Sequence, residues 1–166
     1  MGDEIWVSGR LGDARLALEV FRGRVALAGQ AFEQVRAAME RPMPRLALGQ
    51  ALRGVATAAL DISDGLLGDL GHVLTASRVG ATLELAALPR SEVLAAQPPA
   101  LQQECLLAGG DDYELVFTAP PGARLPDVGV PLTRIGRIEA EPGLRVVDAR
   151  GEPVAHGLRS FDHFQS

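Results

Sequence analysis

The 166-residue sequence contains no lysine, and its sixteen basic residues are all arginine. These residues therefore exclude a mechanism that needs a lysine, whether as a nucleophile, as the amine of a Schiff base, or as the lysine of a phosphate-binding P-loop. Cysteine is almost absent as well, because Cys105 is the only one. A single cysteine forms no internal disulfide and no cysteine metal cage, which fits a reducing cytoplasm. We expect Cys105 to be buried as a small apolar side chain.

The sequence also lacks a long apolar run and a surplus of positive charge. No apolar run approaches the roughly 18 residues that span a bilayer, and the N-terminal MGDEIWVSGR does not have the pattern of a signal peptide. The net charge is −5, so the sequence as a whole has no basic footprint for nucleic acid. We expect a cytoplasmic protein with neither a membrane nor a nucleic-acid partner.

The length fits one domain, and 47% hydrophobic residues are enough for a core. Short apolar runs alternate with helical periodicities, which predicts an α/β or α+β fold. Strands are predicted at 5–7, 81–85, 114–118, 132–138 and 144–148, and helices at 13–21, 28–39, 46–52, 65–77 and 100–107. The run ATAALDI at 56–62 has almost no alternation and predicts a central strand that is buried on both faces.

The strongest local signal is DISDG at 61–65, where that strand is expected to pass into a helix. Asp61 and Asp64 are three residues apart across a tight turn. Two such carboxylates suit Mg2+, which proteins commonly hold with one or two carboxylates plus substrate phosphates. Ser63 adds a hydroxyl, and the N-terminus of the following helix favours an anion. The alternative is that Asp64 is merely a helix N-cap and Asp61 a solvated strand end.

Two further segments are candidates for a site. AGGDDYEL at 108–115 places two glycines and two carboxylates before a strand. Such a loop can ligate a metal, accept hydrogen bonds from a substrate, or simply turn the chain. SFDHF at 160–164 is rich in rings in a sequence with only 4% aromatic residues. It predicts either a surface on which a ligand stacks or a latch that packs on the core.

Five segments resemble, in order, the C-terminal domain of the thiamine-monophosphate kinase family. They lie at 2–18, 41–52, 59–72, 109–118 and 160–164. The DISDGL turn is shared with aminoimidazole ribonucleotide synthetase, selenophosphate synthetase and a hydrogenase-maturation protein, whereas the DYEL and DHF segments are more particular to the kinase. The resemblance implies a layered α/β (α+β) domain with a mixed sheet and flanking helices, like the C-terminal domain of aminoimidazole ribonucleotide synthetase.

The resemblance also implies a reaction, in which the γ-phosphoryl group of ATP passes to thiamine monophosphate in the presence of Mg2+. The products are thiamine diphosphate and ADP. By position, Asp61 and Asp64 correspond to Mg2+ ligands and Ser63 to an ATP contact. Asp111 stands at a substrate-binding position that is usually Glu, and Phe161 at an aromatic position that lies against the substrate. No residue here corresponds to a catalytic acid, base or nucleophile.

Members of this family begin with another α/β domain, which supplies most of the metal-binding aspartates, much of the ATP site and the dimer interface. The present sequence starts where the C-terminal domain begins. We therefore expect residues 1–166 to be the single C-terminal domain of a two-domain, homodimeric kinase, and to be inactive alone. The alternative, from another class, is a non-catalytic ligand-binding or assembly module with the same fold.

Overall fold

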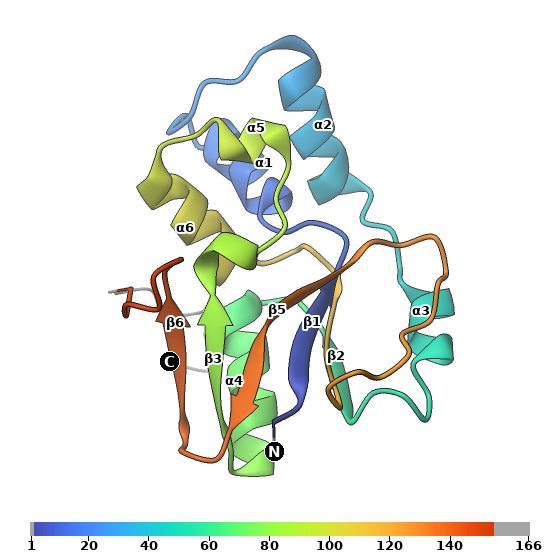
Figure 1. Ribbon diagram of the computed structural model, residues 1–166. Coiled ribbons are helices and arrows are strands. Elements are labelled where there is room, and N and C mark those ends of the chain that lie inside the picture. Colours follow the sequence, from blue (N-terminus) through green and yellow to red (C-terminus); the bar gives the residue numbers. More distant parts are fainter. Residues whose placement is uncertain (1, 155–166) are drawn as a thin grey trace, which may run out of the picture.

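The computed structural model describes residues 2–154, which form one mixed sheet of six strands in the order β2-β4-β1-β5-β3-β6, with helices around it (Figure 1). The predicted fold class is confirmed. The strands are β1 (Glu4–Ser8), β2 (Ala58–Asp61), β3 (Gly80–Glu84), β4 (Leu115–Ala119), β5 (Leu132–Glu139) and β6 (Gly143–Val147). The helices are α1 (Asp13–Phe21), α2 (Gly29–Glu40), α3 (Leu46–Ala51), α4 (Leu66–Ser77), α5 (Glu92–Ala95) and α6 (Pro99–Ala108), with a 3-10 turn η1 at Leu85–Ala87.

Because of the strand directions, the candidate loops all lie beyond the same ends of the strands. We call this side of the sheet, where the strand ends lie, its upper edge. Strands β1, β2, β3 and β6 run one way, and β4 and β5 run antiparallel to their neighbours. The carboxyl ends of β1 and β2 therefore lie at the same edge as the start of β4. In Figure 1 this is the upper edge, above which α1, α2, α5 and α6 gather. The loop 9–12, the turn 61–65 and the loop 109–114 all leave the sheet there.

The core lies on both faces of the sheet. Successive strand residues point to opposite faces. In β1, Ile5 and Val7 belong to the larger cluster, which α1, α4 and α6 cover, whereas Trp6 packs against a smaller cluster under α3. Cys105 of α6 is fully buried in the larger cluster, as expected. Burial raises the pKa of its thiol to about 12, so this cysteine stays protonated and inert.

The prediction of a central strand at 56–62 is wrong. Only Ala58–Asp61 is a strand. This strand, β2, is the outermost one on its side of the sheet and pairs with β4 alone among the described strands. Its residues alternate between half-buried and exposed. Three of the seven residues of the run are alanine, which is apolar but too small to demand burial on two sides. The short elements η1 and α5 were not predicted, since three or four residues show no periodicity.

No helix in the part of the chain that the structure describes is long and apolar enough to cross a membrane.

Candidate functional site

A buried carboxylate from α4 holds the DISDG turn in shape. Asp69, one turn into the helix, accepts the backbone N–H of Ser63 at 2.8 Å and that of Asp64 at 3.0 Å. Burial raises the pKa of Asp69, and these N–H groups offset part of that effect. Gly65 occupies the N-cap position of α4, with a φ of 110°. The interpretation of Asp64 as the N-cap is therefore wrong. The carboxylate that accepts backbone N–H groups at the start of the helix is that of Asp69.

The acidic loop at 110–114 is paired directly with this turn. Its backbone extends the pairing of β2 with β4 beyond the last residue of β2 and ahead of the first residue of β4. The bonds run from Asp111 N–H to Ser63 O (2.9 Å), from Tyr113 N–H to Ile62 O (2.9 Å) and from Ile62 N–H to Glu114 O (2.8 Å). Gly110 permits the close approach, because a Cβ there would lie 2.5 Å from the carbonyl oxygen of Ser63. The structure thus brings Asp111 beside Ser63 and Asp64.

Two residues of this loop have left-handed backbones, Asp111 with a φ of 65° and Tyr113 with a φ of 50°. Such conformations cost on the order of 1–3 kcal/mol for residues other than glycine and cluster at functional sites. Both side chains are exposed, and the Tyr113 hydroxyl donates to Oδ1 of Asp111 at 3.3 Å. The Asp111 carboxylate is the main cause that raises the pKa of Tyr113, so the hydroxyl remains a donor.

Asp112, between these two residues, joins the acidic loop to the loop after β1. Both of its carboxylate oxygens accept the Gly12 N–H at 3.0 Å. Burial raises the pKa of Asp112 well above its ordinary value, and the nearby Asp13 and Glu114 act in the same direction. Gly12 has a φ of 87°, and a Cβ there would lie 2.8 Å from the Leu94 side chain. A glycine is therefore needed at this junction.

The side chain of Glu114 connects the acidic loop with the end of β1 and with the segment before α3, at the upper edge of the sheet. Its carboxylate receives Nε of Arg45 at 2.7 Å and Nη2 at 2.5 Å, and the Ser8 hydroxyl donates to it at 2.5 Å. A Cβ at Gly9 would overlap the same carboxylate. Hydrogen bonding to Glu114 raises the pKa of Arg45. Since Arg45 directly precedes α3, the ion pair ties α3 to the edge that carries the acidic loop.

Two of the hollows beside these segments are lined by residues that were predicted from the sequence. Ser63, Asp64 and Asp111 line a cavity of about 220 Å3 whose other wall is α1. Asp61 and Tyr113 line a groove of about 570 Å3 against residues 42–53, which we call the α3 groove. Of the sequence-predicted residues, Ser63, Asp64 and Asp111 thus share the smaller cavity, whereas Asp61 lines the neighbouring α3 groove. Phe161 lies outside the described residues.

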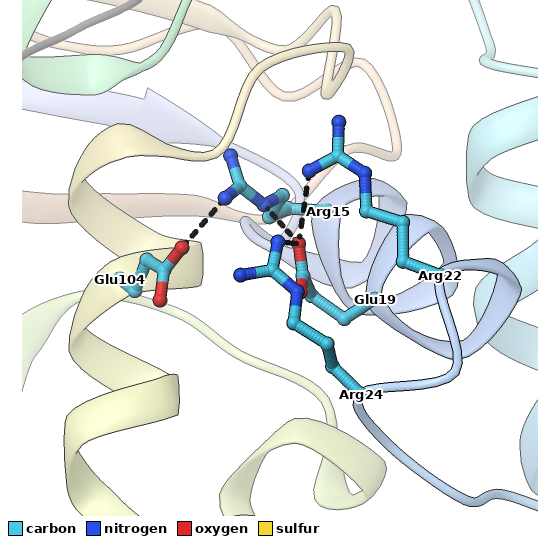
Figure 2. A network of polar contacts seen from close by, with 5 residues as sticks. All are labelled: Arg15, Glu19, Arg22, Arg24 and Glu104. Carbon is cyan, nitrogen blue, oxygen red and sulfur yellow. Dashed lines mark hydrogen bonds and ion pairs between the residues drawn. The ribbon is translucent and has the colours of Figure 1, made fainter.

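Arg15 of α1 and Arg22, the residue that follows α1, form the positive wall of the smaller cavity and were not identified from the sequence. Both line it together with Asp64. Figure 2 shows three guanidinium groups converging on the buried Glu19, namely those of Arg15 (2.7 Å), Arg22 (3.4 Å) and Arg24. Arg15 also reaches Glu104 of α6 at 2.5 Å. The i, i+4 spacing of Arg15 and Glu19 and the i, i+3 spacing of Glu19 and Arg22 are the sequence signals that could have revealed this cluster.

The donor set fits a divalent cation that is shared with a phosphate ligand. Within residues 2–154 no group of three or more His, Cys, Asp or Glu side chains is arranged to hold a metal ion. Asp61 and Asp64 supply two carboxylates, one exposed and one half-buried, on a turn fixed from below by Asp69. Mg2+ characteristically binds one or two carboxylates and takes its other ligands from phosphates and water. These residues are suited to hold part of such a site.

Comparisons with known proteins agree on one family. Residues 1–149 match AIR synthase related protein, C-terminal domain. The chain is 42% identical to thiamine-monophosphate kinase of Escherichia coli K12, over 98% of this chain and 53% of that protein. It is similar to the crystal structure of thiamine-monophosphate kinase from Stenotrophomonas maltophilia K279a, with a TM-score of 0.82, 42% identity, and coverage of 93% of this chain and 52% of that one.

A further solved structure, AaThiL complexed with AMPPCP and TMP, has a TM-score of 0.81 and 30% identity, and the match covers 99% of this chain and 52% of that one. The chain thus spans about half the length of the curated relatives that it matches.

Proposed function

Since the chain belongs to the AIR synthase related family, as its C-terminal domain, we propose that it is the C-terminal half of a thiamine-monophosphate kinase. The observation that carries this proposal is the pairing of the DISDG turn with the acidic loop, which puts Asp61, Asp64 and Asp111 at one edge of the sheet. We further propose that the whole enzyme is a cytoplasmic homodimer that is joined through an N-terminal domain.

In the proposed reaction, a phosphate oxygen of thiamine monophosphate bonds to the γ-phosphorus of ATP. The bond from that phosphorus to the β,γ-bridging oxygen breaks, and ADP leaves with the electron pair. Bound Mg2+ would supply charge neutralisation for the phosphates. In this proposal Asp61 and Asp64 hold the cation, Ser63 contacts ATP, and Asp111 contacts the thiamine part of the substrate. The turn that carries the first three is kept rigid by Asp69.

The test compares the 166-residue chain with a two-domain form, meaning these residues preceded by the N-terminal half expected from the family. We expect no measurable formation of thiamine diphosphate by the 166 residues alone, because two carboxylates hold a metal–nucleotide complex poorly. The two-domain form should turn over ATP and thiamine monophosphate in a coupled ADP-release assay. Steady turnover by the short chain would contradict the need for a second domain. An inactive two-domain form that still binds ligand would favour the binding module.

Phe161 is proposed to stack on the thiamine moiety. Removing the ring in Phe161→Ala should raise the KM for thiamine monophosphate by about tenfold, since an aromatic contact adds about 0.5–1.5 kcal/mol beyond the buried area. The KM for ATP should stay nearly unchanged, and Phe161→Trp should be tolerated. Steady-state kinetics of the two-domain form, with melting temperatures measured in parallel, check this. A lower melting temperature with an unchanged KM would identify Phe161 as a latch on the core.

A further inference from the structure

Tyr113 combines a strained backbone with an exposed ring. Its φ of 50° lies in the left-handed region, which asparagine or glycine adopts at lower cost. The side chain is 40% exposed, so burial in the core does not offset that cost. Two bonds nevertheless hold the residue in place, from its N–H to Ile62 O and from its hydroxyl to Asp111. A strained backbone whose cost is not offset by burial of the side chain points to a role outside the core.

The ring of Tyr113 lines the α3 groove, whose chemistry is mixed. Leu46, which is 74% exposed, and Leu115 give the groove apolar surface, and Asp61 supplies a carboxylate from the end of β2. Two guanidinium groups also line the groove, that of Arg45, which is paired with Glu114, and that of Arg53, which suits a phosphate. Asp111 lines the smaller cavity, but it accepts a hydrogen bond from the Tyr113 hydroxyl and so places a second carboxylate beside that end of the ring. A flat ligand that carries positive charge on its ring, and is linked to a phosphate, matches this combination. A neutral purine gains nothing from the two carboxylates.

We propose that Tyr113 is a specificity-determining residue whose ring binds the cationic heteroaromatic ring of the substrate in the α3 groove. The inference rests on the proposed function, which makes this ring the thiazolium of thiamine monophosphate. Aromatic faces attract cations, and the nearby carboxylates act in the same direction. The thiazolium and the phosphate are joined by an ethyl chain. A ring that lies on Tyr113 therefore keeps its phosphate near Asp61, where the metal site is proposed.

Three variants of the two-domain form test this role. Tyr113→Asn removes the ring but suits the left-handed backbone, so the melting temperature should not fall. Its KM for thiamine monophosphate should rise by about tenfold, while the KM for ATP changes by less than about twofold. Tyr113→Phe keeps the ring and should retain most of the affinity. Phe21→Ala, which removes another exposed ring outside the groove, is the matched control and should leave both KM values unchanged.

The outcomes separate the role of the ring from the function itself. An unchanged KM for thiamine monophosphate in Tyr113→Asn, in an active enzyme, overturns the role of Tyr113 alone. Equal losses in Tyr113→Asn and Tyr113→Phe overturn it too, because they assign the effect to the hydroxyl that holds Asp111. If the unmodified two-domain form does not phosphorylate thiamine monophosphate, the proposed function falls, and the substrate assigned to Tyr113 falls with it.

Discussion

Asparagine at position 61 or 64 is expected to lower the kcat of the two-domain form by at least about a hundredfold, since loss of even an outer-shell partner of a metal ligand costs about 10–100-fold. Asp61→Asn and Asp64→Asn each remove a negative charge at a proposed Mg2+ position while keeping the size of the side chain. The fold should survive, because the Asp69 carboxylate, which accepts two N–H groups of the turn, is unchanged in both variants. The measurement is kcat as a function of Mg2+ concentration.

Asp127→Asn is the matched control for these two variants. Asp127 is a carboxylate of the proline-rich loop at 120–131, and among the bonds found in the structure it accepts only a local one, from the Gly129 N–H at 3.1 Å. Asparagine preserves that bond, so kcat and the Mg2+ dependence should stay at their original values. If Asp61→Asn and Asp64→Asn behave like Asp127→Asn, the metal-binding role is refuted, and the two residues are a solvated strand end and a turn residue.

Removal of the Glu114 carboxylate is expected to be the most destabilising single change at the site. In Glu114→Ala, the Arg45 guanidinium and the Ser8 hydroxyl lose their common partner at a buried position. Breaking a buried ion pair costs about 3–5 kcal/mol, and we expect about 3 kcal/mol here. The lower value follows from Arg45, whose side chain is 22% exposed and keeps some contact with water. Urea denaturation of the 166-residue chain measures the loss.

The ion pair between Arg36 and Glu40 on the outside of α2 provides the comparison. Nε of Arg36 and Oε1 of Glu40 are 2.8 Å apart, but both side chains are 42% exposed. Surface ion pairs contribute little to stability, so Glu40→Ala should shift the urea midpoint only slightly. A loss in Glu114→Ala no greater than that in Glu40→Ala would show that the site edge holds together without the Arg45 pair. A change in the slope of the transition would instead indicate that the loop had unfolded separately.

Local patterns were sufficient to predict most elements of this fold and the two acidic segments. Helix periodicity located α1, α2 and α4. The assignment of DISDG as a site, made from the ligand chemistry and the spacing of Asp61 and Asp64, stays a prediction. The edge position of β2 was not predictable from its run of small apolar residues. Only the pairing with β4 decides which side of the strand has a neighbour.

Contacts between distant segments were the part that the sequence could not supply. Nothing local indicates that Asp111 bonds to Ser63, or that Arg45 and Ser8 share the carboxylate of Glu114. The same holds for the choice between Asp64 and Asp69 as the residue that serves the start of α4. Both are carboxylates near the helix N-terminus, and only the direction of their side chains distinguishes them. The left-handed backbone of Tyr113 likewise results from its pairing with Ile62.

The position of β1 in the strand order also bears on how the chain folds. Strand β1 lies between β4 and β5, so both of its neighbours follow it by more than 100 residues in the sequence and are synthesised much later. Pairing must then close very long loops, and folds that are rich in such contacts form slowly. Ser8 and Glu114 come together in the same event. The edge that carries the acidic residues is therefore among the last parts to assemble, and a nascent chain that ends before β4 exposes β1 to pairing with other chains.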